Sequence, residues 1–235
     1  MFKPRFATSH TLVPILSKDA INDIGEKLVE DFCPQAMTTP TEIDVDRFIT
    51  RYLGLEQDFQ YLSHCGVFLG MTVFNDTDRV PVFNPDRWEA KYIPVKAGTV
   101  IIDNILLEEN QEHRYRFTCG HEAAHSILHA EYFKAQAKKA QLSDNGVQMV
   151  QCRRSTAQYG KGCRAKTDSD WLEWQANQLA SAILMPKSMV IAKVREARRI
   201  YRNNVNAPMQ AVAETFNVSN DAAFYRLQDL GLLQR

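Results

Sequence analysis

Apolar positions in the first half of the chain recur at helical spacing and then at strand spacing. Residues 19–32 place apolar side chains three or four positions apart, which predicts an amphipathic helix that ends before Pro34. Asp44 stands where it can cap a second, shorter helix. Between residues 58 and 103, short runs rich in β-forming residues predict strands over 59–62, 67–74, 81–83 and 99–103. The pattern therefore predicts an α+β fold with a small twisted β-sheet.

Helical spacing returns in the second half of the chain. It predicts a helix around residues 118–129, which continues or frays over 130–140, and another that opens near 170 and stops at Pro186. A further helix is predicted over 187–202, and residues 209–230 resemble a helix-turn-helix. Residues 142–170 are expected to form a mobile surface excursion near the active site. We divide the chain into an N-terminal extension and helix (1–40), a core (41–187) and a C-terminal helical region packed on the core (188–235).

The predicted helix around residues 118–129 contains the motif His-Glu-x-x-His. On a helix, His121 and His125 stand on one face about 6 Å apart along the axis, so that both imidazoles can reach one metal ion. Glu122 is turned roughly 100° from His121 and is placed to touch a metal-bound water as a general base. The alternative is a surface helix with two solvent-facing histidines. The apolar residues around the motif favour a buried helix instead, and buried imidazoles need partners.

A catalytic zinc site needs a third protein ligand. His129 lies about 12 Å along the helix axis from His121, too far to share the ion, and we interpret it as a helix-end or core histidine. Glu173 lies on the helix that stops at Pro186, on a face otherwise made of small residues. Asn177, one turn later, can accept a hydrogen bond from the second nitrogen of a ligand histidine. An alternative reading makes Glu173 part of a capping box with Asp170 as the N-cap.

These motifs together resemble the ImmA/IrrE family of metallopeptidases. The resemblance rests on Arg116-Phe117-Thr118-x-x-His121-Glu122-x-x-His125, Glu173-Trp174-Gln175-Ala176-Asn177 and Leu184-Met185-Pro186, and covers roughly residue 41 to the C-terminus. It implies a gluzincin-like core in which the sheet packs on the His-Glu-x-x-His helix and on the helix of the third ligand. It also implies that His121, His125 and Glu173 bind Zn2+ and that Glu122 is the catalytic base. Cys119-Gly120 and the long stretch from 130 to 170 depart from the family pattern.

Members of that family are cytoplasmic endopeptidases that typically cleave a helix-turn-helix repressor, and the resemblance implies such a protein substrate here. An edge strand of the sheet is expected to bind the substrate backbone. The ligand set only biases the metal, so Mn2+ and Fe2+ stay open. The oxyanion-stabilising residue also stays open among His64, His113, Tyr159 and the arginines.

Composition agrees with a cytoplasmic protein. The 28 basic and 28 acidic residues balance, so no global field draws the chain to nucleic acid or to a membrane. There is no run of eighteen apolar residues and no signal peptide. The five cysteines are irregularly spaced, as expected for a reducing compartment. A second zinc site at Cys152 and Cys163 would need two more ligands, which are not evident, and we disfavour it.

Two other functions stay open. The first is a DNA-binding regulator that uses the C-terminal helices and has a structural or vestigial metal site. Residues 209–235 carry two arginines against three acids, which favours docking over DNA binding, although residues 187–202 carry six cations against one acid. A structural zinc site normally closes all four positions, which also disfavours this function. The second is a module that binds a peptide partner without cleaving it.

Overall fold

The computed structural model describes residues 1–141, 149–153, 167–202 and 204–233. The described helices are α1 (Lys18–Phe32), α2 (Val45–Arg47), α3 (Glu112–Leu128), α4 (Ala130–Gln141), α5 (Asp168–Leu184), α6 (Lys187–Ile200), α7 (Ala207–Phe216) and α8 (Asn220–Asp229). A π-helical turn, Phe48–Tyr52, continues α2, and short 3-10 turns span Pro34–Met37 and Asn104–Leu107. The strands are β1 (Glu56–Gln60), β2 (Phe68–Val73), β3 (Thr77–Asn84), β4 (Glu89–Val95), β5 (Thr99–Asp103) and β6 (Met149–Arg153). The fold is α+β, as predicted.

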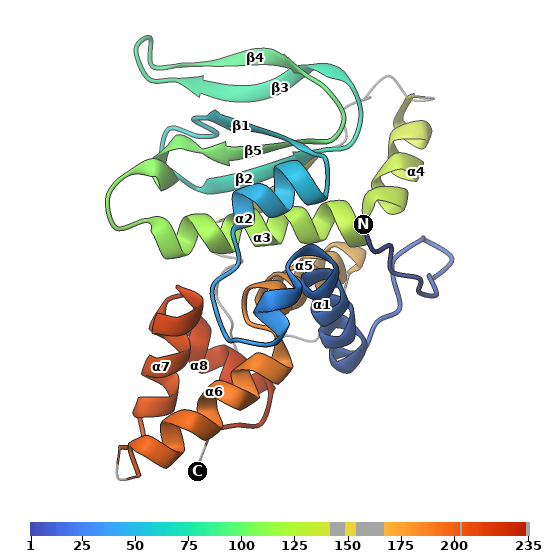
Figure 1. The fold of residues 1–235 in the computed structure, drawn as a ribbon. Helices are drawn as coiled ribbons and strands as arrows, with labels where there is room; N and C mark the ends of the chain where they lie inside the picture. Colours follow the sequence, from blue (N-terminus) through green and yellow to red (C-terminus); the bar gives the residue numbers. More distant parts are fainter. Residues whose placement is uncertain (142–148, 154–166, 203, 234–235) are drawn as a thin grey trace.

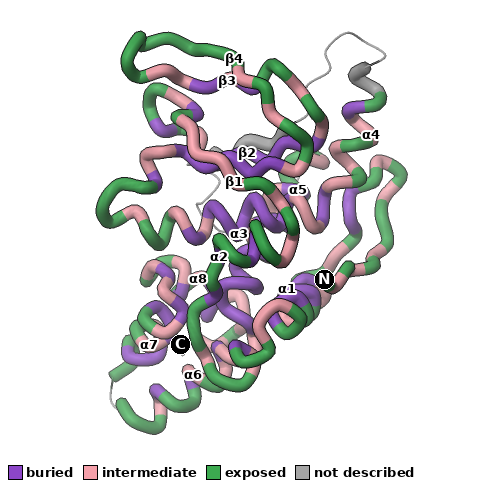
Figure 2. Tube along the Cα trace, turned by 45° about the horizontal axis from the view of Figure 1, so that its top comes forward, coloured by how far each residue is buried: buried purple, intermediate pink, exposed green. Residues whose placement is uncertain are grey.

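The layers follow one another down the molecule in Figure 1. The β3–β4 hairpin lies over a four-stranded sheet of order β1-β5-β2-β6, α3 runs beneath the sheet, and α5 and α1 lie beneath α3. Helices α6, α7 and α8 form the opposite end of the molecule. The view coloured by burial shows α3 as a mostly buried helix between the layers (Figure 2). The sequence prediction that this helix is buried is therefore confirmed.

The sheet is mixed. Strand β1 pairs with β5 in parallel, whereas β2 pairs with both β5 and β6 antiparallel. Its two faces bury different side chains because successive residues of a strand point in opposite directions. Val100 and Ile102 of β5 join the main core with α3, and Ile101 joins a second core beneath the hairpin. The sheet is thus fixed on one side by α3 and on the other by β3–β4.

The strand predictions were incomplete. β5 has the predicted bounds, β2 is close to them, β1 begins three residues early, and β3 extends well beyond the predicted 81–83. Strands β4 and β6 were not predicted at all. Residues 142–148 and 154–166 of the predicted surface excursion lie outside the described residues.

Helix boundaries follow local sequence signals. Ser17 caps α1 by accepting a hydrogen bond from the Ala20 amide, and Asp44 caps α2 in the same way from the Arg47 amide. Thr167 and Asp170 form a reciprocal capping box at the start of α5. The alternative in which Asp170 was the N-cap and Glu173 its partner is therefore wrong. Glu173 lies one turn further along α5, and its carboxylate is available for another role.

Two buried arginines tie the C-terminal helices to the rest of the molecule. The guanidinium of Arg116 on α3 donates to the carbonyl oxygens of Phe216 and Asn217 at the end of α7. Arg226 on α8 donates twice to the carbonyl oxygen of Met185 at the end of α5. Carbonyl groups at helix ends lack partners inside the helix, so each arginine satisfies groups that burial would otherwise leave unpaired. The division of the chain into three parts stays a prediction.

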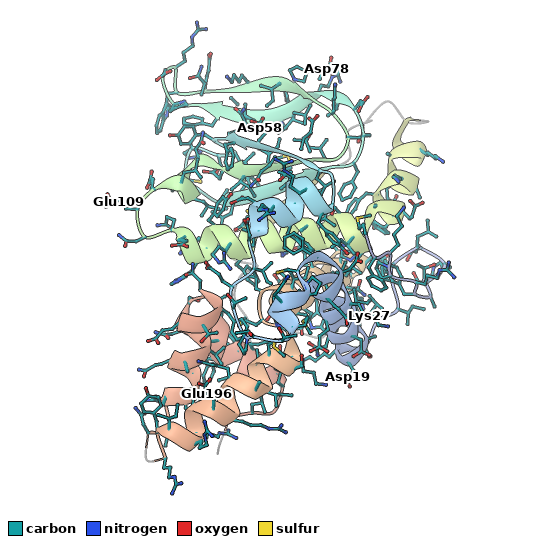
Figure 3. All side chains as sticks on the ribbon, viewed as in Figure 1. Asp19, Lys27, Asp58, Asp78, Glu109 and Glu196 are labelled. Carbon is teal, nitrogen blue, oxygen red and sulfur yellow. The ribbon has the colours of Figure 1, made fainter. Side chains whose placement is uncertain are left out.

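Charged side chains are concentrated on the outside of these layers. Asp78 on the hairpin and Glu196 on α6 project into solvent at opposite ends of the molecule (Figure 3). None of the described helices is both long and apolar enough to cross a membrane.

Close contact between α1 and α5 depends on a glycine, which gives a stability prediction. A Cβ at Gly25 would lie 2.6 Å from the Cβ of Ala182 and 3.1 Å from its carbonyl carbon. Overpacking costs about 1–3 kcal/mol. At Gly120 on α3 the nearest atom would be 3.4 Å away, an ordinary contact. Both changes to alanine gain the same helix propensity of roughly 1 kcal/mol. We therefore expect Gly25→Ala to unfold at a lower urea concentration than Gly120→Ala in the metal-free protein, and equal midpoints would contradict the tight contact.

Candidate metal centre

Helices α3 and α5 bring three of the predicted residues to one point. His121 and His125 on α3 are fully buried, and the side chain of Glu173 on α5 is 20% exposed. The Nε2 atoms of the two histidines lie 3.0 Å apart. One carboxylate oxygen of Glu173 lies 3.4 Å from His121 Nε2, and the other lies 3.4 Å from His125 Nε2. Within the described part of the chain, these three residues form a group whose potential ligand atoms all lie within 4.8 Å of one another.

This donor set fits a metal ion. Ligands at about 2.0–2.2 Å from a tetrahedral ion are separated from one another by about 3.3–3.6 Å, close to the distances found here. Glu173 Oε2 is buried and has no hydrogen-bond partner, which is unusual for a carboxylate oxygen. A cation between the three side chains would satisfy it. The arrangement is therefore a possible metal site formed by two histidines and one glutamate.

Electrostatics favour the protonation states that ligands need. Burial alone would raise the pKa of Glu173, but the close approach of the two imidazoles outweighs burial and holds that pKa well below its usual range. Burial lowers the pKa of His125, and Glu173 opposes this only in part. The glutamate is therefore ionised and the histidine neutral at neutral pH, as metal ligands must be.

Asn177 lies where the sequence placed it, one turn after Glu173. Its Oδ1 is 2.9 Å from His121 Nδ1. An amide oxygen only accepts hydrogen bonds, so Nδ1 of His121 carries the proton. In a neutral imidazole, this leaves the Nε2 lone pair directed at His125 and Glu173. Asn177 thus fixes the tautomer and the orientation of the ring.

Glu122 points from the same helix toward the sheet. Its Oε2 accepts a hydrogen bond of 2.5 Å from the hydroxyl group of Thr72 on β2, whereas its buried Oε1 has no hydrogen-bond partner. Burial raises the pKa of Glu122 to about 7, against the opposing effects of His121 and Thr72. One oxygen is therefore held in place, and the other can accept a proton.

Gly70 allows β2 to approach this carboxylate. A Cβ at Gly70 would lie 2.7 Å from Glu122 Oε1 and 2.7 Å from the Cγ2 atom of Thr118. Sequence reasoning missed both Gly70 and Thr72, since nothing local to β2 indicates which residues of α3 it covers. A glycine inside an apolar strand run was the one available signal, because it often marks a close backbone approach.

Gly70→Ala tests this packing. The added methyl group would displace the Glu122 carboxylate, and a misplacement of about 1 Å at a catalytic group can lower the rate by about 10²-fold. If Glu122 acts as a base, we expect a fall in kcat of about that size with unchanged metal content, measured by substrate cleavage and elemental analysis. Thr72→Ser keeps the hydroxyl group and serves as the matched control. Full kcat in Gly70→Ala would mean that the position of Glu122 is unimportant.

The two histidine candidates for an oxyanion donor lie away from the cluster, and the arginines stay open as candidates. His113 is at the start of α3, where its Nε2 lies 3.1 Å from Asn217 Oδ1. His64 lies beside the rings of Phe83 and Trp88 at the hairpin. Neither is part of the cluster, and Tyr159 lies outside the described residues. So do Cys163 and the side chain of Cys152, which leaves the proposed second zinc site untested.

A comparison with protein families matches a segment in the C-terminal half of the chain. Residues 164–228 match the family model of the IrrE N-terminal-like domain, a peptidase family. The match covers less than a third of the chain and includes Glu173 and Asn177, but it begins after the His-Glu-x-x-His helix and does not include it. The search of curated proteins found no match. The matched segment and the independent geometry of α3 together support a metallopeptidase-type function.

Proposed function

We propose that the chain is a zinc-dependent endopeptidase of the ImmA/IrrE type, which the family match over residues 164–228 supports. The observation that carries the proposal is the meeting of three ligand atoms beside a second, differently held carboxylate. His121, His125 and Glu173 would hold the metal through their converging nitrogen and oxygen atoms. Glu122 does not share that role, since its carboxylate is held by β2. The two glutamates thus have separate environments and separate tasks.

The residues of the chain supply binding and proton transfer. A zinc ion bound there would lower the pKa of a coordinated water toward about 7 and polarise the scissile carbonyl group. Glu122 takes a proton from the attacking water and returns it to the leaving amine. In the metal-free chain, burial raises the pKa of Glu122, which favours the uptake of a proton by this carboxylate. Thr72 keeps the carboxylate oriented through its hydrogen bond to Oε2.

The substrate is proposed to be a protein, and more narrowly a helix-turn-helix repressor of transcription. The support for this narrower class is the family resemblance. Zinc is favoured by the two imidazoles and one carboxylate, which recur in catalytic zinc sites. The same ligand types also bind Fe2+ or Mn2+, so elemental analysis of the purified protein is needed to identify the metal.

The test is to incubate the purified chain with the repressor encoded beside its gene, with and without a metal chelator. We expect the repressor to be cleaved, the chelator to stop this cleavage and added zinc to restore it. Mass spectrometry of the fragments measures the cleavage. If the chain bound the repressor but did not cleave it with any of the metals added, the result would support the peptide-binding module instead. If a protein shown to contain metal neither bound nor cleaved the repressor, the proposed substrate would be refuted. Cleavage that resists the chelator would refute the metal mechanism.

DNA binding by the C-terminal helices is the alternative function. The one arginine of α8 is buried and bound to the Met185 carbonyl oxygen, so it is not available to phosphate groups. The exposed residues of α8 are Asn220, Asp221, Phe224 and Gln228. These carry no positive charge, although exposed Arg195 and Arg199 on α6 do. A salt-dependent mobility shift of promoter DNA by the full chain would favour this alternative.

A further inference from the structure

His125 has a second nitrogen that faces away from the candidate metal, and it begins a chain of buried polar contacts. Its Nδ1 lies 2.9 Å from Nδ1 of His129, the C-cap residue that directly follows α3. The other ring nitrogen of His129 lies 3.1 Å from Oε1 of Gln175 on α5. The amide nitrogen of Gln175 donates to the carbonyl oxygen of Pro14 at 2.7 Å. His125, His129, Gln175 and Pro14 are all buried, so the chain links α3, α5 and the N-terminal segment away from solvent.

The direction of every hydrogen bond in this chain follows from its last member. The carbonyl oxygen of Pro14 can only accept, so the amide group of Gln175 must present its nitrogen there. Its oxygen then faces His129 and can only accept, which places a proton on Nε2 of His129. A neutral His129 has a lone pair on Nδ1 and accepts from Nδ1–H of His125. His125 is thereby left with a lone pair on Nε2, the nitrogen that faces His121 and Glu173.

The reverse order is excluded by geometry. If the Gln175 amide were flipped, its oxygen would lie about where its nitrogen now contacts the Pro14 carbonyl oxygen, and two acceptors would face each other without a proton. Asn177 does for His121 directly what this chain of contacts does for His125. In the neutral rings, both Nε2 lone pairs and the Glu173 carboxylate thus converge on one place, where a cation would satisfy three acceptors that otherwise face one another.

We propose that His129 and Gln175 are positioning residues that hold His125 in its metal-binding tautomer and orientation, with the Pro14 carbonyl oxygen as the final acceptor. The proposal rests on the proposed function only in taking His125 as a ligand. His129 does not contact the ion in this scheme, in agreement with its distance along the helix. Such partners of ligand histidines typically change metal affinity or activity by 10–100-fold when removed. The N-terminal segment is then part of the site's support through Pro14.

The first test reads the tautomer directly in the metal-free wild-type chain. Two-bond 1H–15N NMR spectra at a pH where the histidines are neutral distinguish a protonated nitrogen from a bare one. We expect the proton of His125 on Nδ1 and the proton of His129 on Nε2. A His125 that carries its proton on Nε2 would overturn the proposal, and this result does not depend on the folding of any variant.

The second test measures zinc affinity by competition with a chromogenic chelator. His129→Leu and Gln175→Met remove the polar atoms and are expected to weaken zinc binding by about 10–100-fold. His129→Gln can still accept from His125 and donate to Gln175, and is expected to recover most of the affinity. His113→Leu, which removes an exposed histidine from the same helix, is the matched control and should bind as the wild type does.

The outcomes separate this proposal from the proposed function. Unchanged affinity in both His129→Leu and Gln175→Met, together with wild-type cleavage, would overturn the positioning role and leave the peptidase intact. A weakened His129→Leu that His129→Gln does not restore would also count against the hydrogen-bond order, because volume alone would then explain the loss. A wild type that binds zinc with the expected tautomers but cleaves no substrate would support the positioning role and count against the peptidase.

Discussion

Replacing Glu122 with glutamine is expected to lower kcat by about 10²–10⁴-fold while leaving zinc content unchanged. General acid–base catalysis contributes that much to the rate, and glutamine is isosteric but cannot take up a proton. The change also removes a buried carboxylate whose pKa is raised to about 7 by burial, so the fold should not be destabilised by the loss of a charge. Rates of repressor cleavage and the metal content of the same preparation check the two halves of the prediction.

The control for this variant is Glu131→Gln on α4, where the carboxylate is 81% exposed and pairs with Lys134. That change alters the same chemical group outside the site and should leave kcat within twofold, as expected for a weak surface ion pair. Full cleavage by Glu122→Gln would show that another group takes the proton from water. A loss of metal in Glu122→Gln would show that Glu122 belongs to the ligand set, contrary to its contact with Thr72.

Much of the site could be predicted from sequence because its residues follow helix periodicity. His121 and His125 share a face of α3 since they are four residues apart, and Glu173 and Asn177 share a face of α5 for the same reason. The spacing of residues within each helix could not show that the two helices are in contact, because this contact depends on how α5 packs against α3. The capping alternative for Glu173 also needed the structure, since Thr167 and Asp170 are both reasonable caps.

The unpredicted features depend on contacts between distant segments. Strand β4 is exposed along most of its length and has no alternating apolar pattern, so it is a strand only because it pairs with β3. Strand β6 is likewise defined by its pairing with β2. The roles of Thr72 and Gly70 arise where β2 crosses α3, about fifty residues away in sequence. Local propensity carries no information about such crossings.

His129 was correctly excluded as a metal ligand, but its contact with His125 was not predicted. It was excluded as a ligand because of its distance from His121, and the structure confirms it as a buried residue at the helix end. The same helical geometry places it one turn from His125, close enough for a ring-to-ring hydrogen bond. The spacing therefore contained the signal, but its partner Gln175 and the Pro14 carbonyl oxygen come from other segments.

Glu173→Gln is expected to remove the response of the protein's stability to zinc. A ligand at 100 times its dissociation constant stabilises the folded state by about 2.7 kcal/mol. For a chain of this size, each kcal/mol raises Tm by roughly 2–4 °C, so zinc should raise the wild-type Tm by about 5–11 °C. Glutamine keeps the shape of the side chain but lacks the charge that the two imidazoles now stabilise. At the same zinc concentration its Tm should therefore move by less than about 2 °C, as measured by differential scanning calorimetry.

Asp170→Asn gives the matched control, because it changes a carboxylate one turn earlier on the same helix. It weakens the capping box of α5 and is expected to lower stability by about 1 kcal/mol with or without zinc. Its zinc-dependent rise in Tm should equal that of the wild type. If Glu173→Gln kept the wild-type rise instead, the ion would be bound without this carboxylate. The convergence of α3 and α5 would then be a packing contact, and the proposed peptidase would lack its third ligand.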